Sequence, residues 1–490
     1  MGGTLRARTV WLGLALLFVT FPFTVARFVP SAELPQHAAQ IRLLEELWGL
    51  ASATVDTSAY RVRPFAPNTL IYWPMFLLAR LFTPAAAAKL TLLLIAWWVT
   101  LSLQVLAYRR KRSALSALLA GMLVFSGPLY AGLLGFLAGL PFFLLLAGRI
   151  ASPWPGQARV LELAIMVCLS LLLVWSHVLW LPVVLACFAV EALHRTSRRA
   201  LAFRAAGLVP TLVFLAYGYP ELLTHASLPA LDSGMSTVPV LRGLSFSNLV
   251  VLWFGGVQGW TEAAAAIVLL LYIPVTLLGL YGPRGFELDT RLLLLGALLS
   301  GFALFGPDTW MGTPNISVRF APFGMMLLVL SLPPLRSALM ALLFLGCAAF
   351  FSLTLSLAWY LFNQEDLTGL SASLGAAPGP TRMIEIDYRG EASTLRGRPF
   401  VHSFAYFQAR YGGEGPYSLA DTGRAIVTKR QTSPERYRRG IVGDGPSVQV
   451  HGDVSCFLVN GTRGQQATFK AQTGLESRVD RGFFQLYCRE

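Results

Sequence analysis

The sequence predicts an all-α polytopic membrane protein that carries a small β-rich domain outside the membrane. Of its 490 residues, 55% are hydrophobic and only 13% are charged, whereas soluble proteins carry roughly 25% charged residues. Long apolar runs alternate with short loops in which Arg and Lys gather, as at 109–112. After Asn363 the chain becomes polar and contains short alternating stretches that are typical of strands.

The apolar runs predict about eleven membrane spans, because most approach the ~20 residues that a helix needs to cross the hydrocarbon core. Arg6 and Arg8 favour a cytoplasmic N-terminus, and the basic clusters favour cytoplasmic loops. An odd number of spans then leaves the C-terminal region outside the cytoplasm. The expected spans are residues 10–26, 89–107, 114–130, 132–146, 160–176, 179–193, 204–219, 263–280, 292–305, 320–332 and 338–361.

These spans define the domain organisation. The transmembrane domain covers residues 1–361 and includes a long first outer loop, 27–88, and a second outer loop, 220–260. Within the first loop, residues 70–82 are apolar but short for a crossing, so we expect this segment at the outer interface. A linker, 362–380, leads to the extracytoplasmic domain, 381–490, with strands expected at 383–388, 425–429 and 447–450.

The net charge of +14 could suggest nucleic acid as a partner. The basic residues lie in short loops between apolar runs and form no basic stripe with interleaved aromatics, so we expect membrane lipids and not nucleic acid. The sequence contains no Walker loop, no GxGxxG after a strand, no GxSxG and no Cys/His set with zinc spacing. Nucleotide-driven transport and the common soluble-enzyme chemistries therefore have no support.

The polar stretch 30–37, directly after the first span, holds the best candidates for chemistry. Pro35 suits the first turn of a helix, and 38–48 has helical apolar spacing. Glu33 would then lie near the positive end of this helix, which favours the ionised carboxylate. Glu33 and His37 are four residues apart at the mouth of a span. The alternative is that both only solvate a loop at the membrane surface.

Placing an ionisable residue in or beside a membrane span costs free energy, so each such residue is a candidate for a function. His177, at the outer end of the fifth span, either faces a polar cavity or is a helix-end histidine at the interface. Arg319, at the start of the tenth span, either holds a lipid-linked phosphate or is a snorkelling arginine. Glu162 and Glu191 are expected to be solvated near cytoplasmic span ends.

The C-terminal region adds two features. His402, Tyr406 and Arg410 share helical spacing, which an amphipathic helix explains more simply than a ligand site. Cys456 and Cys488 are the cysteines of the polar region, and an extracytoplasmic location would allow them to form a disulfide.

The layout resembles the GT-C membrane glycosyltransferases, in which one span precedes a long outer loop that opens with an acidic residue. Glu33 stands where the family has this acid, and 67–73, Pro-Asn-Thr-Leu-Ile-Tyr-Trp, is similar to the family's Pro-rich stretch ending in Tyr-Trp. The resemblance covers 6–107 in detail and the rest by topology. It departs from the aminoarabinose-transferase type at Ala66-Pro67-Asn68, where the usual lysine is missing, and it offers a single acid in place of a pair.

The resemblance implies transfer of a sugar from a polyprenyl-phosphate-linked donor to an acceptor outside the bacterial inner (plasma) membrane. Glu33 would be the base or a ligand of a divalent cation, Mg²⁺ or Mn²⁺, and His37 would orient Glu33 or contact the acceptor. Arg319, with Arg242 as a weaker candidate, would neutralise the leaving phosphate. Two other classes stay open: a transporter or flippase of a lipid-linked substrate, and a non-enzymatic assembly factor of the cell envelope.

Overall fold

The computed structural model divides the chain into two compact units. The first unit comprises Met1–Val25 and Leu93–Leu357, and the second comprises Ala26–Leu92 and Ala358–Glu490. The first outer loop of the sequence therefore belongs to the same unit as the C-terminal region. The structure describes residues 2–152, 159–194, 197–226, 245–278, 288–307, 309–310, 313–335, 337–380, 382–415, 418–422, 425–430 and 454–489.

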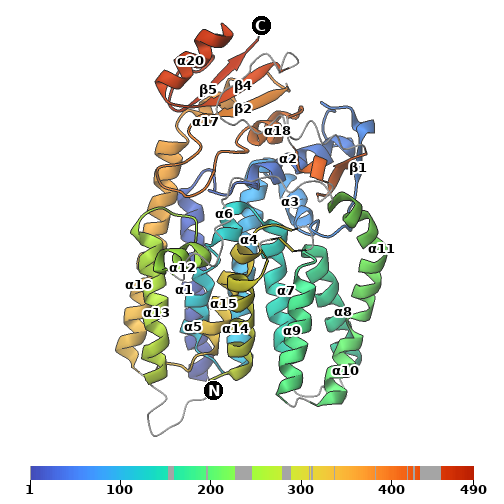
Figure 1. Cartoon of the computed structure of the whole chain (residues 1–490), viewed down its shortest axis with the longest axis vertical. Coiled ribbons are helices and arrows are strands. Elements are labelled where there is room, and N and C mark those ends of the chain that lie inside the picture. The colour runs from blue at the N-terminus through green and yellow to red at the C-terminus, as the bar shows by residue number, and fades with distance from the viewer. Residues whose placement is uncertain are drawn as a thin grey trace. The chain divides into compact units, whose positions relative to one another are not determined.

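Helices make up the first unit, and its long helices run side by side (Figure 1). Two helices, α4 and α16, continue from this unit into the second. The helices are α1 (Gly2–Val25), α4 (Pro84–Arg109), α5 (Ala114–Met122), α6 (Gly127–Ala131), α7 (Leu134–Ile150), α8 (Arg159–Ser176), α9 (Trp180–Leu193), α10 (Arg198–Ala206), α11 (Val209–Ala226), α12 (Phe246–Trp253), α13 (Trp260–Leu278), α14 (Thr290–Phe305), α15 (Ile316–Ser331) and α16 (Ala338–Leu361).

Within the described residues, 7 helical segments are long and apolar enough to cross a membrane, among them Pro84–Arg109 and Ala338–Asp366. Shorter apolar helices occupy the places of the other expected spans: Leu134–Ile150, Trp180–Leu193, Thr290–Phe305 and Ile316–Ser331. The apolar helices thus follow the expected order, while the count of about eleven crossings stays a prediction.

Helices α14 and α15 pack backbone against backbone. A Cβ atom added at Gly296 would lie 2.9 Å from the Gly324 carbonyl oxygen, and one added at Gly324 would lie 2.7 Å from the Ser300 nitrogen. Only glycine permits this approach, and small residues at helix contacts are the usual means of close packing in membranes.

The expectation that Glu162 and Glu191 are solvated is wrong. Glu162 is buried, and its Oε1 accepts a hydrogen bond from Arg204 Nε at 3.2 Å. Glu191 is also buried, with Arg291 Nη1 at 3.2 Å. Each carboxylate lies close to a guanidinium from another helix, and pairing of this kind is what makes burial of a charge tolerable.

The second unit begins with the first outer loop, which is not an extended connection. It contains α2 (Leu34–Leu47), a short 3₁₀ turn (Thr57–Ala59), β1 (Tyr60–Val62) and α3 (Tyr72–Ala79). Helix α3 occupies the segment that we expected at the interface. Strand β1 pairs antiparallel with β3 (Val427–Lys429), so the C-terminal strand expected at 425–429 completes a sheet with the first loop.

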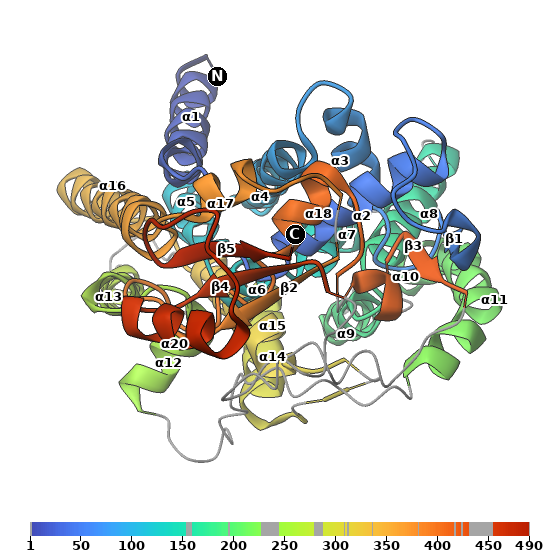
Figure 2. The same ribbon diagram turned by 90° about the horizontal axis from the view of Figure 1, so that it is seen from above.

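The C-terminal part of the second unit contains a three-stranded sheet in the order β2-β4-β5. Strand β2 (Met383–Asp387) pairs parallel with β4 (Cys456–Asn460), which pairs antiparallel with β5 (Phe484–Cys488). Helix α20 (Arg463–Thr473) lies along this sheet (Figure 2), and its Phe469 packs into the apolar cluster with Ile384, Phe457 and Tyr487. The strand expected at 447–450 lies outside the described residues.

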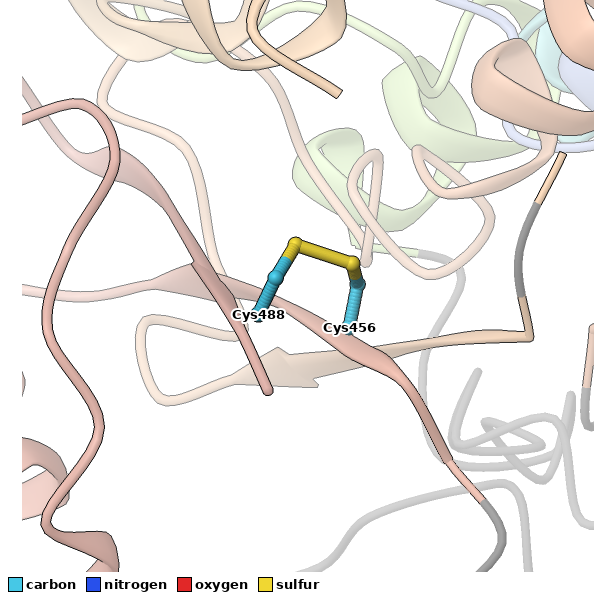
Figure 3. The surroundings of a disulfide bond; sticks show 2 residues. All are labelled: Cys456 and Cys488. Carbon is cyan, nitrogen blue, oxygen red and sulfur yellow. A yellow bond between two sulfur atoms is a disulfide. The ribbon is translucent and has the colours of Figure 1, made fainter. Parts of the chain in front are cut away.

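Cys456 and Cys488 form a disulfide between β4 and β5 (Figure 3). The two residues are register partners in the sheet, with their Cα atoms 4.1 Å apart. The linker expected at 362–380 is also structured, since it holds a helical turn (Phe362–Asp366) and α17 (Leu370–Gly375).

Candidate active site

Glu33 is the residue that precedes α2, and the helix begins there for local reasons. Pro35 occupies the first turn, where the absent N–H costs no helical hydrogen bond. The Glu33 carbonyl accepts the His37 N–H at 3.1 Å and closes the first turn. The Glu33 side chain is partly exposed, and its carboxylate interacts electrostatically with Tyr72. The site therefore combines a carboxylate with the positive end of a helix dipole, as the sequence predicts.

His37 contacts a tyrosine that sequence reasoning did not assign to the site. Its Nδ1 lies 2.8 Å from the Tyr72 hydroxyl oxygen, and both side chains are buried. Burial, followed by the Glu33 charge, raises the pKa of Tyr72 well above its ordinary value, so the phenol stays protonated. The hydrogen bond fixes the orientation of the imidazole and couples its tautomer to the phenol proton. Glu33, His37 and Tyr72 thus form one polar group, which we name the Glu33 site.

Side-chain amides hold the chain on either side of the Glu33 site. Asn363 Oδ1 accepts the Phe28 N–H at 2.7 Å, and Asn363 Nδ2 donates to the Phe28 carbonyl at 2.9 Å. On α2, Gln36 accepts the Leu419 N–H at 3.3 Å and Gln40 accepts the Val427 N–H at 3.2 Å. Segments from the far end of the chain therefore fix both the entry to α2 and its first turns.

His402 of the C-terminal region also lies near the Glu33 site. Burial, assisted by the charge of His37, lowers the pKa of His402 to about 3, so the two imidazoles are within electrostatic range. The helix expected to contain His402 begins later: α18 (Ala405–Tyr411) holds Tyr406 and Arg410, while His402 occupies the turn before it. The prediction that His402 shares one helix with Tyr406 and Arg410 is therefore wrong for His402.

Arg319 and His177 belong to the first unit, where both contact one aromatic ring. The Arg319 guanidinium carbon lies 5.4 Å from the centroid of the Phe136 ring, and the His177 ring meets Phe136 edge-on at 5.3 Å. Arg319 Nε donates to the Pro314 carbonyl at 3.1 Å. His177 Nδ1 accepts the Leu179 N–H at 3.2 Å, which places the proton of a neutral imidazole on Nε2.

The ring of Phe136 is itself held in place. Trp180 stacks on it at 4.8 Å and donates from Nε1 to the Phe136 carbonyl at 2.9 Å. Arg319 and His177 are thus on one rigid aromatic platform, which we name the Phe136 platform. Arg242, the weaker phosphate-binding candidate, lies outside the described residues.

A metal site needs more ligands than the Glu33 site supplies. Among the described residues, no group of three or more His, Cys, Asp and Glu side chains could hold a metal ion. Glu33 and His37 are too few to complete a coordination shell by themselves.

A cavity of ≈ 30 Å³ farther along α2 is lined by Arg42, Tyr60 and Lys429, among others. It has room for about two water molecules.

Comparison with solved structures identifies the fold. The chain is similar to ArnT from Cupriavidus metallidurans in the apo state, with a TM-score of 0.51 and 12% identity over 99% of this chain and 98% of that one. It is equally similar to the same protein bound to undecaprenyl phosphate, with a TM-score of 0.52 and 12% identity over 98% and 97% of the two chains. Comparison with protein-family models and with curated proteins found no match. The apolar helices identify an integral membrane protein, and over nearly its whole length the chain has the fold of ArnT.

Proposed function

We propose that this protein transfers a sugar from a polyprenyl-phosphate-linked donor to an acceptor on the outer face of the bacterial inner membrane. The observation that carries the proposal is the Glu33 site: a carboxylate at a helix N-terminus beside an imidazole that is oriented by a protonated tyrosine. The similarity of fold to ArnT, one of whose structures contains undecaprenyl phosphate, supports a lipid-linked donor.

Glu33 acts as the general base in this proposal. Its carboxylate takes the proton of the acceptor nucleophile, whose freed electron pair forms the new bond to the anomeric carbon of the sugar. The bond between that carbon and the phosphate oxygen breaks, and the polyprenyl phosphate leaves with the bonding pair. His37, held by Tyr72, orients Glu33 or the acceptor.

Arg319 and His177 are the proposed donor-binding residues. A guanidinium stabilises the charge that builds up on a leaving phosphate, and a neutral imidazole with its proton on Nε2 can donate to a phosphate oxygen. The Phe136 platform holds both side chains in place before the donor binds, which reduces the cost of ordering them.

The divalent cation also stays a proposal. Mg²⁺ is often held by one or two carboxylates together with substrate phosphates. A cation bound through Glu33 and donor phosphate oxygens would satisfy this pattern without a third protein ligand. No step above is assigned to it.

The test compares Glu33→Gln with wild type in cells that lack the native protein. Mass spectrometry of the envelope glycans measures transfer. We expect a fall of about a hundredfold or more, because general bases contribute roughly 10²–10⁴-fold. Glu365→Gln is the matched control, since Glu365 is an exposed glutamate of the same unit. A correctly inserted Glu33→Gln protein with full transfer would remove the catalytic assignment.

A further inference from the structure

His402 lies on a segment whose two flanks are fixed by buried groups. Two residues before it, the fully buried Phe400 ring stacks on Phe362 at 6.0 Å and meets Phe484 at 5.8 Å. Two residues after it, the Phe404 N–H donates to Glu385 Oε2 at 3.0 Å. Residues 400–404, which we name the His402 turn, are therefore held at both ends, and His402 has a defined position.

The His402 turn leads directly into α18, which packs against α2, the helix that Glu33 precedes. Helices α18 and α2 lie side by side (Figures 1 and 2). Tyr406, on the first turn of α18, contacts Phe28 with ring centroids 4.8 Å apart, and Phe28 lies on the segment that leads to Glu33. Together with the electrostatic interaction between His402 and His37, this packing brings the His402 turn to the N-terminal end of α2.

The chemistry of His402 differs from that of His37. An imidazole whose pKa is about 3 stays neutral at working pH, so it does not compete with Glu33 for the proton of the nucleophile. A neutral imidazole still offers one N–H donor and one nitrogen acceptor. The residue keeps some solvent-exposed surface, but its Nδ1 is enclosed, so a substrate group would reach the ring from its Nε2 side.

We propose that His402 is an acceptor-binding residue: it forms a hydrogen bond to an uncharged polar group of the acceptor, such as a hydroxyl, beside Glu33. This inference rests on the proposed function and deepens it, because it assigns part of the acceptor specificity to the C-terminal part of the chain. The competing explanation is packing, since the His402 ring also meets Phe404 edge-on at 6.3 Å.

Two substitutions separate binding from packing. His402→Phe keeps an aromatic ring against Phe404 but removes the hydrogen-bonding nitrogens, whereas His402→Asn keeps a donor and an acceptor but removes the ring. Arg410→Gln is the control, because Arg410 is an exposed residue of the neighbouring helix.

The assay uses the purified full-length protein with a lipid-linked donor fraction in excess. The acceptor is envelope extract from cells that lack the protein, supplied over a dilution series. Thermal stabilisation by undecaprenyl phosphate is measured in parallel as a readout of donor-side binding. For His402→Phe we expect half-maximal rate to need about threefold to tenfold more extract, as the loss of one neutral hydrogen bond implies. The maximal rate and the stabilisation by undecaprenyl phosphate should stay near wild type, and His402→Asn should show a smaller effect.

The inference is wrong if His402→Phe reaches its half-maximal rate at the same extract concentration as wild type. This holds whether or not its maximal rate is lower. If His402→Phe fails to fold, His402→Asn provides the test. A His402→Asn protein that needs the wild-type extract concentration for half-maximal rate but is less thermally stable would show that the residue serves packing. Absence of any transfer by the wild-type protein removes the proposed function itself, which distinguishes that failure from failure of this inference alone.

Discussion

At the scale of single residues, Tyr72 is the partner on which the orientation of His37 depends. Its pKa is raised by burial and by Glu33, so at working pH it acts as a neutral hydrogen-bonding group and not as a base. Tyr72→Phe keeps the buried ring but removes the 2.8 Å contact to His37 Nδ1. We expect a fall in sugar transfer of roughly tenfold, the scale set by about 1–1.5 kcal/mol for one hydrogen bond, measured as initial rate at saturating acceptor.

Tyr411→Phe is the matched control for this change. Tyr411 belongs to the same unit and donates one hydrogen bond to the Leu374 carbonyl at 2.9 Å, so the substitution also removes one buried contact. Equal loss of rate in both variants would mean that the effect comes from general destabilisation and not from His37.

At the scale of elements, strand β2 carries a buried acid that couples the stability of the second unit to pH. Glu385 is buried, and desolvation, followed by the Asp387 charge, raises its pKa well above the ordinary 4.5. The folded state therefore holds a proton that the unfolded chain releases. The stability that this proton contributes is fully present below about pH 4.5 and is lost as the pH rises through the raised pKa.

Glu385→Gln should remove this pH dependence, because the amide is neutral and its oxygen can still accept the Phe404 N–H. We expect the melting temperature of the solubilised protein to rise by about 2–4 °C at pH 8 and to change little at pH 4.5, followed by intrinsic fluorescence. Parallel pH profiles for wild type and variant would contradict the assignment.

The strand pair β4–β5 is joined by the Cys456–Cys488 disulfide, which closes a loop with a sequence separation of 32. Closing a loop of this length reduces the conformational entropy of the unfolded chain, so Cys488→Ser should lower the free energy of unfolding by about 3–4 kcal/mol. Denaturant titration under non-reducing conditions measures the change. Cys168→Ser, at an exposed free cysteine, is the control, and equal stability of Cys488→Ser and wild type would refute the prediction.

At the scale of the whole molecule, three ion pairs join helix ends at four of the loops that we expect on the cytoplasmic side. Arg110 pairs with Asp289 at 2.6 Å, Arg204 with Glu162 at 3.2 Å and Arg291 with Glu191 at 3.2 Å. In the first unit these contacts bring together helix ends that charge bias independently assigns to one side of the membrane.

Labelling of single cysteines tests this topology in a background without the three free cysteines. Ser197→Cys, at the exposed start of α10, should react with a membrane-impermeant maleimide only after the cells are opened. Ala467→Cys, exposed on α20, should react in cells whose inner membrane is intact. Reaction of both positions from the same side would overturn the orientation and the odd number of spans.

The sequence by itself determined the order of the apolar helices, the start of α2 near Pro35 and the strand at β2. These features follow from local physics: an apolar run must form a helix to satisfy its backbone in lipid, and alternation predicts a half-buried strand. Glu33 and His37 could be singled out because one helical turn separates them, and the first turn of α2 keeps them near each other.

Only the tertiary structure decided which distant side chains meet. Arg319 and His177 appeared in the sequence as separate interfacial residues, yet both contact Phe136. Tyr72 contacts His37 and His402 interacts with it electrostatically, each from another segment of the chain. Glu162 and Glu191 are buried in ion pairs instead of being solvated. The periodicity of a segment shows which face of that helix or strand is apolar. Contacts between elements depend on how all their faces pack together, and the sequence of one segment does not contain this information.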